Sequence, residues 1–127
     1  MPSPADYRYS ETHEWFHVDG DTVTMGITKF ATDELTDITY VELKPAGTSV
    51  SPGTAIGEVE SVKTTSEVYS AIEGEIAEVN QAVIDDPSLL NTDPFNAGWL
   101  VKIKTSDPSP LQSLMDQETY DRKHPVG

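Results

Sequence analysis

The sequence predicts an all-β sandwich or barrel with a helical appendage at the C-terminus. Short segments rich in β-branched and aromatic residues recur along the chain, turn signals separate them, and the helix signals are marginal. A length of 127 residues is enough for one domain with a hydrophobic core and too short for two. We therefore expect residues 1–127 to form a single domain, with its core from about residue 7 to residue 121 and frayed ends.

The first expected element is a β-hairpin over residues 14–27. Its two segments flank Asp19-Gly20, a dipeptide suited to the positive φ angles of a tight turn. Thr28 can then cap a helix of two turns. Three apolar residues of this helix share one face: Phe30, Ala31 and Leu35.

A strand over residues 37–43 is expected next, covered at least partly on both faces. Its alternation places Thr39, Val41 and Leu43 on one side and Ile38 and Tyr40 on the other. The chain then contains one internal repeat, Gly-Glu-Val-Glu-Ser-Val at 57–62 and Gly-Glu-Ile-Ala-Glu-Val at 74–79. Two similar strands imply a pseudo-symmetric β unit.

Between the repeats, residues 67–72 alternate as a further strand, which makes a hairpin with Lys63 near its tip. The tip contains no Gly or Asn, so a type I turn fits better than the primed turns. Lys63 is the only basic residue from Gly57 to Val79. A lysine at a hairpin tip is by default a solvated side chain, but this position also presents the amine to another enzyme for modification.

The remainder of the chain is less regular. Residues 80–98 carry several breakers and at most one helical turn, at 81–84. The final strand covers residues 99–103. Ser109 as a cap and Pro110 at the first helical position give the clearest helix start in the chain. Arg122–Gly127 is expected to be a polar tail that frays.

Composition excludes several functional classes. The formal net charge of −14 would repel a phosphate backbone, so nucleic acid is not an expected partner. No apolar run approaches the ~20 residues of a membrane helix, and we expect no signal or transit peptide and a cytoplasmic location. The absence of cysteine removes thiolate metal sites and cysteine nucleophiles. The acid excess either steers the protein to basic partners or supports solubility, and both explanations remain open.

His13-Glu14-Trp15-Phe16-His17 matches the H-E-x-x-H signature of zinc peptidases. That signature needs a helix, because both histidines must reach one metal ion. On a strand, four residues span ~13 Å, compared with ~6 Å of rise on a helix. The neighbouring aromatic residues and the Asp-Gly turn favour a strand. We therefore expect no metal role for the histidines, and a zinc peptidase remains a remote alternative.

The order and spacing of several blocks resemble the glycine cleavage H-protein family, from about Tyr9 to Tyr120. The blocks are Thr12-His-Glu-Trp15, Gly26-Ile-Thr28, Tyr40-Val-Glu-Leu43, Gly57-Glu-Val-Glu-Ser-Val-Lys63, Gly74-Glu75 and Gly98-Trp-Leu-Val-Lys-Ile103. The related lipoyl domains of 2-oxoacid dehydrogenases usually have Asp-Lys-Ala, and biotin carriers have Met-Lys-Met. Val62-Lys63-Thr64 fits neither pattern.

The resemblance implies a hybrid barrel-sandwich of the lipoyl and biotinyl carrier type, with lipoate in amide linkage on Lys63. The protein would be a carrier in glycine catabolism and one-carbon metabolism and not itself an enzyme. It would carry an aminomethyl group from the pyridoxal-phosphate enzyme glycine decarboxylase to the tetrahydrofolate-dependent aminomethyltransferase. Dihydrolipoyl dehydrogenase would reoxidise it, and a lipoate-attaching enzyme would load it. We expect a monomer.

In the family the loaded arm docks on its own protein. The matching positions are Thr12, Glu14, Glu34 and Glu67. Two residues depart from the family pattern. Thr36 replaces a usual Gly, which puts the turn after the first helix in doubt, and Ala71 replaces a usual Pro. A paralogue that relays lipoate or serves another lipoate-dependent pathway is therefore an alternative.

Overall fold

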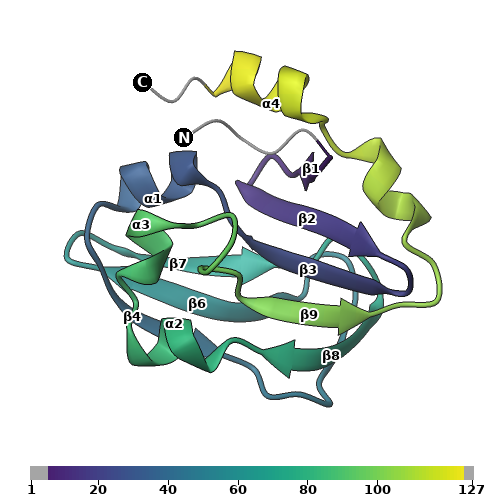
Figure 1. Ribbon diagram of the computed structural model, residues 1–127, viewed down its shortest axis with the longest axis horizontal. Helices are drawn as coiled ribbons and strands as arrows, with labels where there is room; N and C mark the ends of the chain where they lie inside the picture. Colours follow the sequence, from purple (N-terminus) through teal and green to yellow (C-terminus); the bar gives the residue numbers. More distant parts are fainter. Residues whose placement is uncertain (1–5, 125–127) are drawn as a thin grey trace.

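The computed structural model describes residues 6–124 and contains two antiparallel β-sheets with short helices around them (Figure 1). The larger sheet has the strand order β1-β2-β3-β9-β8-β5, and the smaller has the order β4-β6-β7. Within the described residues no strand of one sheet pairs with a strand of the other, so the sheets do not close into a barrel. The prediction of a mainly β fold with a C-terminal helix is confirmed.

The strands of the larger sheet are β1 (Arg8–Tyr9), β2 (Glu14–Asp19), β3 (Thr22–Ile27), β5 (Ser49–Val50), β8 (Gly74–Val79) and β9 (Val101–Lys104). Those of the smaller sheet are β4 (Ile38–Leu43), β6 (Ala55–Ser61) and β7 (Thr65–Tyr69). The helices are α1 (Lys29–Leu35), α2 (Gln81–Asp85), α3 (Leu89–Thr92), the 3-10 helix η1 (Ser109–Ser113) and α4 (Gln117–Lys123).

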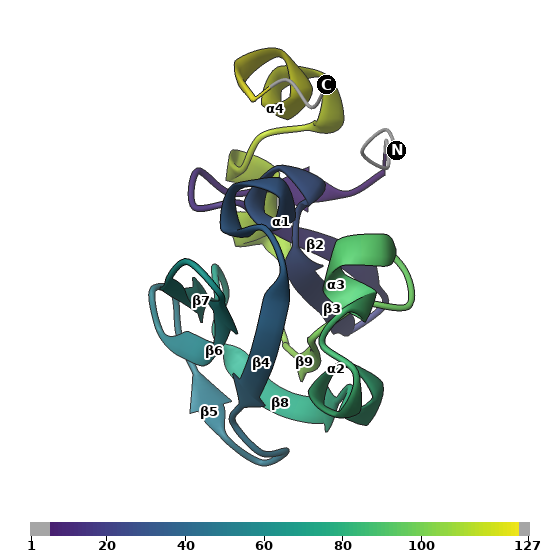
Figure 2. The same cartoon turned by 90° about the vertical axis from the view of Figure 1, so that its left-hand side faces the viewer.

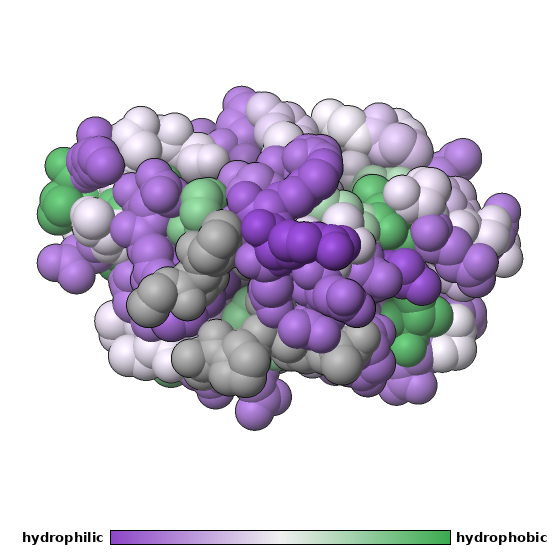
Figure 3. Space-filling model, turned by 90° about the horizontal axis from the view of Figure 1, so that it is seen from above, coloured by the Kyte–Doolittle hydropathy of each residue, from purple (hydrophilic) through white to green (hydrophobic). Residues whose placement is uncertain are grey.

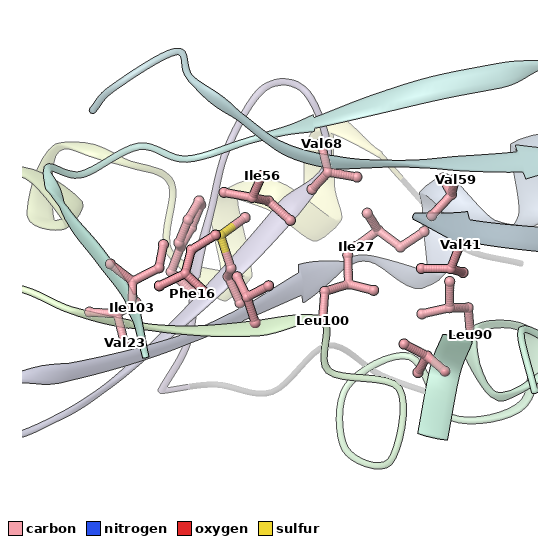
Figure 4. Close-up of a cluster of buried hydrophobic side chains, with 14 of the residues drawn as sticks. Phe16, Val23, Ile27, Val41, Ile56, Val59, Val68, Leu90, Leu100 and Ile103 are labelled. Atoms are coloured by element: carbon pink, nitrogen blue, oxygen red, sulfur yellow. The ribbon is translucent and has the colours of Figure 1, made fainter. Parts of the chain in front are cut away.

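Both sheets contribute side chains to one hydrophobic core. Phe16, Val23 and Ile27 of the larger sheet belong to the same buried cluster as Val41 and Val68 of the smaller one (Figure 4). Burial of this apolar surface is the main force that holds two unpaired sheets together. Figure 2 views the molecule from the side that carries α1 and shows that the chain continues from α1 directly into β4.

A second, smaller cluster lies beneath the C-terminal helix and contains Tyr9, Trp15, Phe95 and Tyr120. The Tyr120 hydroxyl lies 2.7 Å from the Thr28 hydroxyl and 2.8 Å from His13 Nδ1. Burial raises the pKa of Tyr120 to about 12, so the hydroxyl keeps its proton. These contacts fix α4 against the start of α1. Seen from above, the surface around α4 is mostly hydrophilic, with small separate hydrophobic patches (Figure 3).

The first hairpin and the repeat appear as predicted. β2 and β3 pair from residue 14 to residue 27, and Gly20 has a φ of 65°. The two repeats form β6 and β8, which lie in different sheets. A Cβ on Gly57 would lie 2.2 Å from the Glu42 carbonyl oxygen, and one on Gly74 would lie 2.4 Å from that of Lys104. Each repeat therefore begins with glycine because a neighbouring backbone lies too close for a side chain.

The prediction that the strand at 37–43 is covered at least partly on both faces is wrong, because Thr39, Tyr40 and Glu42 are exposed. The pairing of β4 with β6 shifts register between Ile38 and Tyr40. The shift turns both Ile38 and Val41 into the core. Tyr40 is left 46% exposed on the open outer face of the small sheet. A β-bulge of this kind interrupts the simple alternation on which the prediction depended.

The C-terminal helix also starts later than predicted. Ser109 and Pro110 begin only the five-residue η1. The chain then becomes extended, because Met115 and Tyr9 exchange two backbone hydrogen bonds of 2.9 and 3.0 Å. The helix proper, α4, follows Asp116, whose side chain accepts from Thr119 N.

Other boundaries also differ from the predictions: β7 covers Thr65–Tyr69 instead of residues 67–72, and β9 begins at Val101 instead of residue 99. Arg122 and Lys123 belong to α4, so the predicted frayed tail begins too early. Residues 125–127 of that tail lie outside the described part of the chain. Helix α3 had no counterpart among the predicted elements, although the turn predicted at 81–84 is present as α2.

The turn after α1, which the residue Thr36 put in doubt, gives that residue a positive φ. Thr28 caps the helix by accepting from Ala31 N, and the helix ends at Thr36, which has a φ of 65°. The Asn91 side chain holds this turn from both sides: its Nδ2 donates to the Thr36 carbonyl at 2.8 Å, and its Oδ1 accepts from Ile38 N at 3.0 Å. A β-branched residue in this conformation is strained, and these bonds maintain it.

We expect Thr36→Gly to stabilise the protein by about 1 kcal/mol, because relief of the strained φ outweighs the greater flexibility of glycine in the unfolded chain. Denaturant unfolding measures this difference. Thr39→Gly, at an exposed threonine with a negative φ in the next strand, should instead destabilise. A loss of stability in Thr36→Gly as large as in Thr39→Gly would show that the turn is unstrained.

Candidate functional site

Lys63 lies in the turn between β6 and β7. The backbone N–H of Ser61 donates to the carbonyl of Thr64 at 2.8 Å and closes the turn. No residue of the turn has a positive φ, which fits the expected type I geometry and excludes the primed turns. Val62, Lys63 and Thr64 are all exposed. The lysine therefore projects from the end of a hairpin with a defined backbone.

The amine of Lys63 is accessible and unpaired with any acid of the described chain. Its Nζ lies 3.5 Å from the backbone oxygen of Glu34, at the C-terminal end of α1. Within residues 6–124 it forms no ion pair. Val62 N donates to the Asp37 carbonyl at 3.2 Å, which fixes the turn beside the end of α1. An exposed amine without a carboxylate partner suits the formation of an amide with an external acid.

Glu14, the first residue of β2, carries a buried carboxylate, and it pairs with Ile27 just before the start of α1. Glu14 is only 2% exposed. The hydroxyls of Ser10 and Thr12 both donate to its Oε1, and Tyr69 N donates to its Oε2 at 3.1 Å. Burial raises the pKa of Glu14, and these hydrogen bonds act in the opposite direction. The chain thus holds a carboxylate away from water while keeping it hydrogen-bonded.

A cavity of about 460 Å³ opens beside this carboxylate. Its lining combines polar groups with small apolar ones: Ser10, Thr12, Glu14, Pro52, Gly53, Tyr69, Ser70 and Ala71. One carboxylate at the wall of a mostly apolar hollow suits a ligand with an apolar body and a cationic end. Ala71, the second departure from the family pattern, belongs to this lining.

Strand β7 connects the lysine turn with the cavity. Lys63 precedes the strand by two residues, and Tyr69, which binds Glu14, ends it. At ~3.3 Å per residue, the six steps from Lys63 to Tyr69 span at most about 20 Å. In Figure 1, β7 runs from the turn beneath α1 towards β2. Strand β7 therefore marks the direction in which a chain attached to Lys63 would approach the cavity.

The four residues expected to contact a docked arm are not all together. Thr12 and Glu14 meet in the cavity. Glu67 lies on β7 between the lysine and the cavity, is exposed, and raises the pKa of the Tyr69 hydroxyl through a hydrogen bond and its charge. Glu34 lies on α1, where its backbone and not its side chain approaches Lys63.

Sequence reasoning missed two groups that hold Glu14: the hydroxyl of Ser10 and the backbone N–H of Tyr69. The chain turns back at residues 10–13, where His13 N donates to the Ser10 carbonyl at 3.1 Å and His13 takes a φ of 71°. This turn brings Ser10 beside Glu14. A hydroxyl four residues before an acid was the only available signal. The backbone contact from Tyr69, 55 residues away, left no signal in the sequence.

Comparisons with known proteins decide the family. The family model described as "Glycine cleavage H-protein" matches residues 7–125. The chain belongs to the glycine cleavage H-protein family. It is 44% identical over 124 residues to the glycine cleavage system H protein of Synechococcus sp. (strain CC9902), covering 98% of this chain and 96% of that protein. It is 47% identical over 120 residues to that of Thermus thermophilus, with 94% of each chain covered.

The fold agrees with this family assignment. A crystal structure of a glycine cleavage system H protein from Mycobacterium marinum superimposes with a TM-score of 0.88 at 36% identity. The match covers 98% of this chain and all of the other. An H protein of Arabidopsis thaliana named as mitochondrial is 43% identical, covering 92% of this chain and 75% of that protein. The resemblance inferred from the sequence blocks is thus confirmed.

The H-E-x-x-H match at residues 13–17 is explained by the local structure. Residues 14–19 form a strand, so the motif lacks the helix that a zinc peptidase needs. His13 Nδ1 is hydrogen-bonded to the Tyr120 hydroxyl, whereas His17 Nε2 lies 3.4 Å from Asp6. Residues 6–124 contain no group of three or more side chains that could hold a metal ion. The peptidase alternative is not supported.

No helix in residues 6–124 is both long and apolar enough to cross a membrane.

The raised pKa of Glu14 predicts a specific pH dependence of stability. The folded protein binds the Glu14 proton more tightly than the unfolded chain, so Glu14 makes folding less favourable as pH rises from its ordinary pKa of 4.5 through the folded value. Glu14→Gln removes this loss. The unfolding free energy of Glu14→Gln should therefore increase relative to that of the parent protein as pH rises from about 4 to 7. Urea unfolding at a series of pH values measures the difference.

The matched control is Glu75→Gln, at an exposed glutamate of β8. It corrects for the loss of one negative charge from a protein with a net charge of −14. A pH-independent difference between Glu14→Gln and the parent protein would contradict the assigned effect of burial.

Proposed function

We propose that the protein is the lipoyl carrier of a glycine cleavage system, with lipoate attached as an amide to Nζ of Lys63. The observation that carries this proposal is an exposed amine that forms no ion pair within residues 6–124, at the tip of a defined hairpin in a member of the H-protein family. The bound lipoate would supply the sulfurs that carry an aminomethyl group. The chain itself holds, presents and protects this group and catalyses no step.

The cavity beside Glu14 fits the role of a resting place for the loaded arm. An aminomethyl group bears a cationic amine at neutral pH, and the Glu14 carboxylate offers the opposite charge in a place that excludes bulk water. Ser10, Thr12 and Tyr69 N keep the carboxylate in place. Pro52, Gly53 and Ala71 provide an apolar wall for the hydrocarbon part of the arm. Glu67 lies along the path of the arm on β7.

The proposed partners follow from the glycine cleavage system. They are glycine decarboxylase, the tetrahydrofolate-dependent aminomethyltransferase, dihydrolipoyl dehydrogenase and a lipoate-attaching enzyme. The relatives described above all carry the glycine cleavage name, which favours this system over a lipoate relay. Neither Thr36 nor Ala71 lies in the lysine turn. The single-domain organisation, the monomeric state and the cytoplasmic location stay predictions.

Lys63→Arg tests the attachment site. Arginine keeps the positive charge but cannot form the amide, so the variant should fold normally and take up no lipoate. Intact mass measurement after incubation with a lipoate-attaching enzyme should show one lipoyl adduct on the parent protein and none on the variant. Lys29→Arg, on α1, serves as the control and should be modified like the parent. An adduct on Lys63→Arg, or peptide mapping to Lys29, Lys44 or Lys102, would refute the proposed site.

A further inference from the structure

The hydroxyl of Ser61 fixes the backbone of the lysine turn. Its Oγ accepts hydrogen bonds from Lys63 N and Thr64 N, each at 3.1 Å, and donates to the Thr64 carbonyl at 3.2 Å. A serine hydroxyl has one hydrogen and two lone pairs, so these contacts use its whole hydrogen-bonding capacity. One side chain therefore ties down the amide groups of Lys63 and of the residue that follows it.

Few other contacts hold this turn. Strand pairing ends at Glu60 and Thr65, and residues 62–64 are exposed. Outside the hydroxyl, the turn is held by the Ser61–Thr64 backbone bond and by the bond from Val62 N to Asp37. No glycine or asparagine imposes a turn type locally. Within residues 6–124, the partner of the Lys63 backbone N–H is the Ser61 hydroxyl.

We infer that Ser61 is a positioning residue for the modification of Lys63: it holds the turn so that an attaching enzyme receives the amine in one orientation. The inference rests on the proposed function. In the step concerned, the neutral amine attacks the carbonyl carbon of an activated acyl donor such as an acyl adenylate. The C–N bond forms, the bond from that carbon to the leaving oxygen breaks with its electron pair, and the amine releases a proton to solvent.

A positioning role and a purely structural role predict different results. The donors held by Ser61 are exposed, so water can replace the hydroxyl and the fold should lose little without it. The modification reaction, in contrast, needs a turn held in one conformation, because a turn that samples several conformations presents the amine correctly only part of the time. The enzyme still binds the remaining surface of the protein. Loss of the hydroxyl should therefore lower kcat for modification and leave KM nearly unchanged.

The test compares Ser61→Ala and Ser61→Thr with the parent protein as substrates of a lipoate-attaching enzyme. We expect Ser61→Ala to melt within about 2 °C of the parent. Its kcat should fall about tenfold while KM stays within about twofold. Ser61→Thr keeps the hydroxyl and should recover the parent kcat. Thr54→Ala is the matched control. The Thr54 hydroxyl accepts a hydrogen bond from Ser51 N at 3.1 Å, in a turn away from Lys63.

A second measurement separates positioning from the reactivity of the amine. Acylation of Lys63 by a small reagent such as acetic anhydride needs no orientation, so Ser61→Ala and the parent should react at the same rate. An unchanged kcat in Ser61→Ala, a change in KM alone, or no recovery in Ser61→Thr would overturn the inference. If the parent protein itself took up no lipoate on Lys63, the proposed function would fail, and this inference with it.

Discussion

The hydrogen bond from Tyr69 N to the Glu14 carboxylate is the constraint on which the candidate site depends. The two sheets share a core but no paired strands within the described residues. This bond links them directly, because Tyr69 ends β7 in the small sheet and Glu14 begins β2 in the large one. It also fixes the far end of the strand that starts at the lysine turn. The proposed attachment site and the proposed docking cavity thus lie towards opposite ends of one strand.

A buried carboxylate is costly in any protein, and more so in one with a net charge of −14. The chain offsets this cost with three donors, two hydroxyls and one backbone N–H, and the described residues place no cation on it. A lysine or arginine partner would have satisfied Glu14 permanently. Hydroxyl and amide donors leave the negative charge uncompensated. The arrangement therefore suits a site where the compensating charge arrives with the ligand and leaves again.

The fold could be predicted where local chemistry decides it. Asp19-Gly20 fixed the first hairpin, Thr28 capped α1, and the repeat located two strands. The predictions failed where a distant contact overrides the local signal. Met115 pairs with Tyr9 and delays the last helix, and a register shift near Tyr40 opens one face of β4.

The same division applies to the site. Lys63 was evident as the single basic residue in an acidic stretch with a recognisable family block. The resemblance also supplied Glu14 and Thr12. The way Glu14 is held was not predictable, because Ser10 reaches it through an unusual turn at His13 and Tyr69 reaches it across the two sheets. Nor could the sequence show that Glu34 turns its backbone towards the lysine while Glu67 remains on the strand.

The central claim is that a group attached to Lys63 docks against Glu14 along β7. The most direct measurement is the set of amide NMR shifts of the protein with lipoate alone and with the aminomethyl-loaded arm. The account predicts that loading shifts the amide of Tyr69, which donates to Glu14, together with those of Ser70 and Ala71 in the cavity wall. The amide of Gly20, in the β2–β3 turn, should not move. Shifts confined to residues 61–64 would show an arm that never leaves the hairpin tip and would contradict the account.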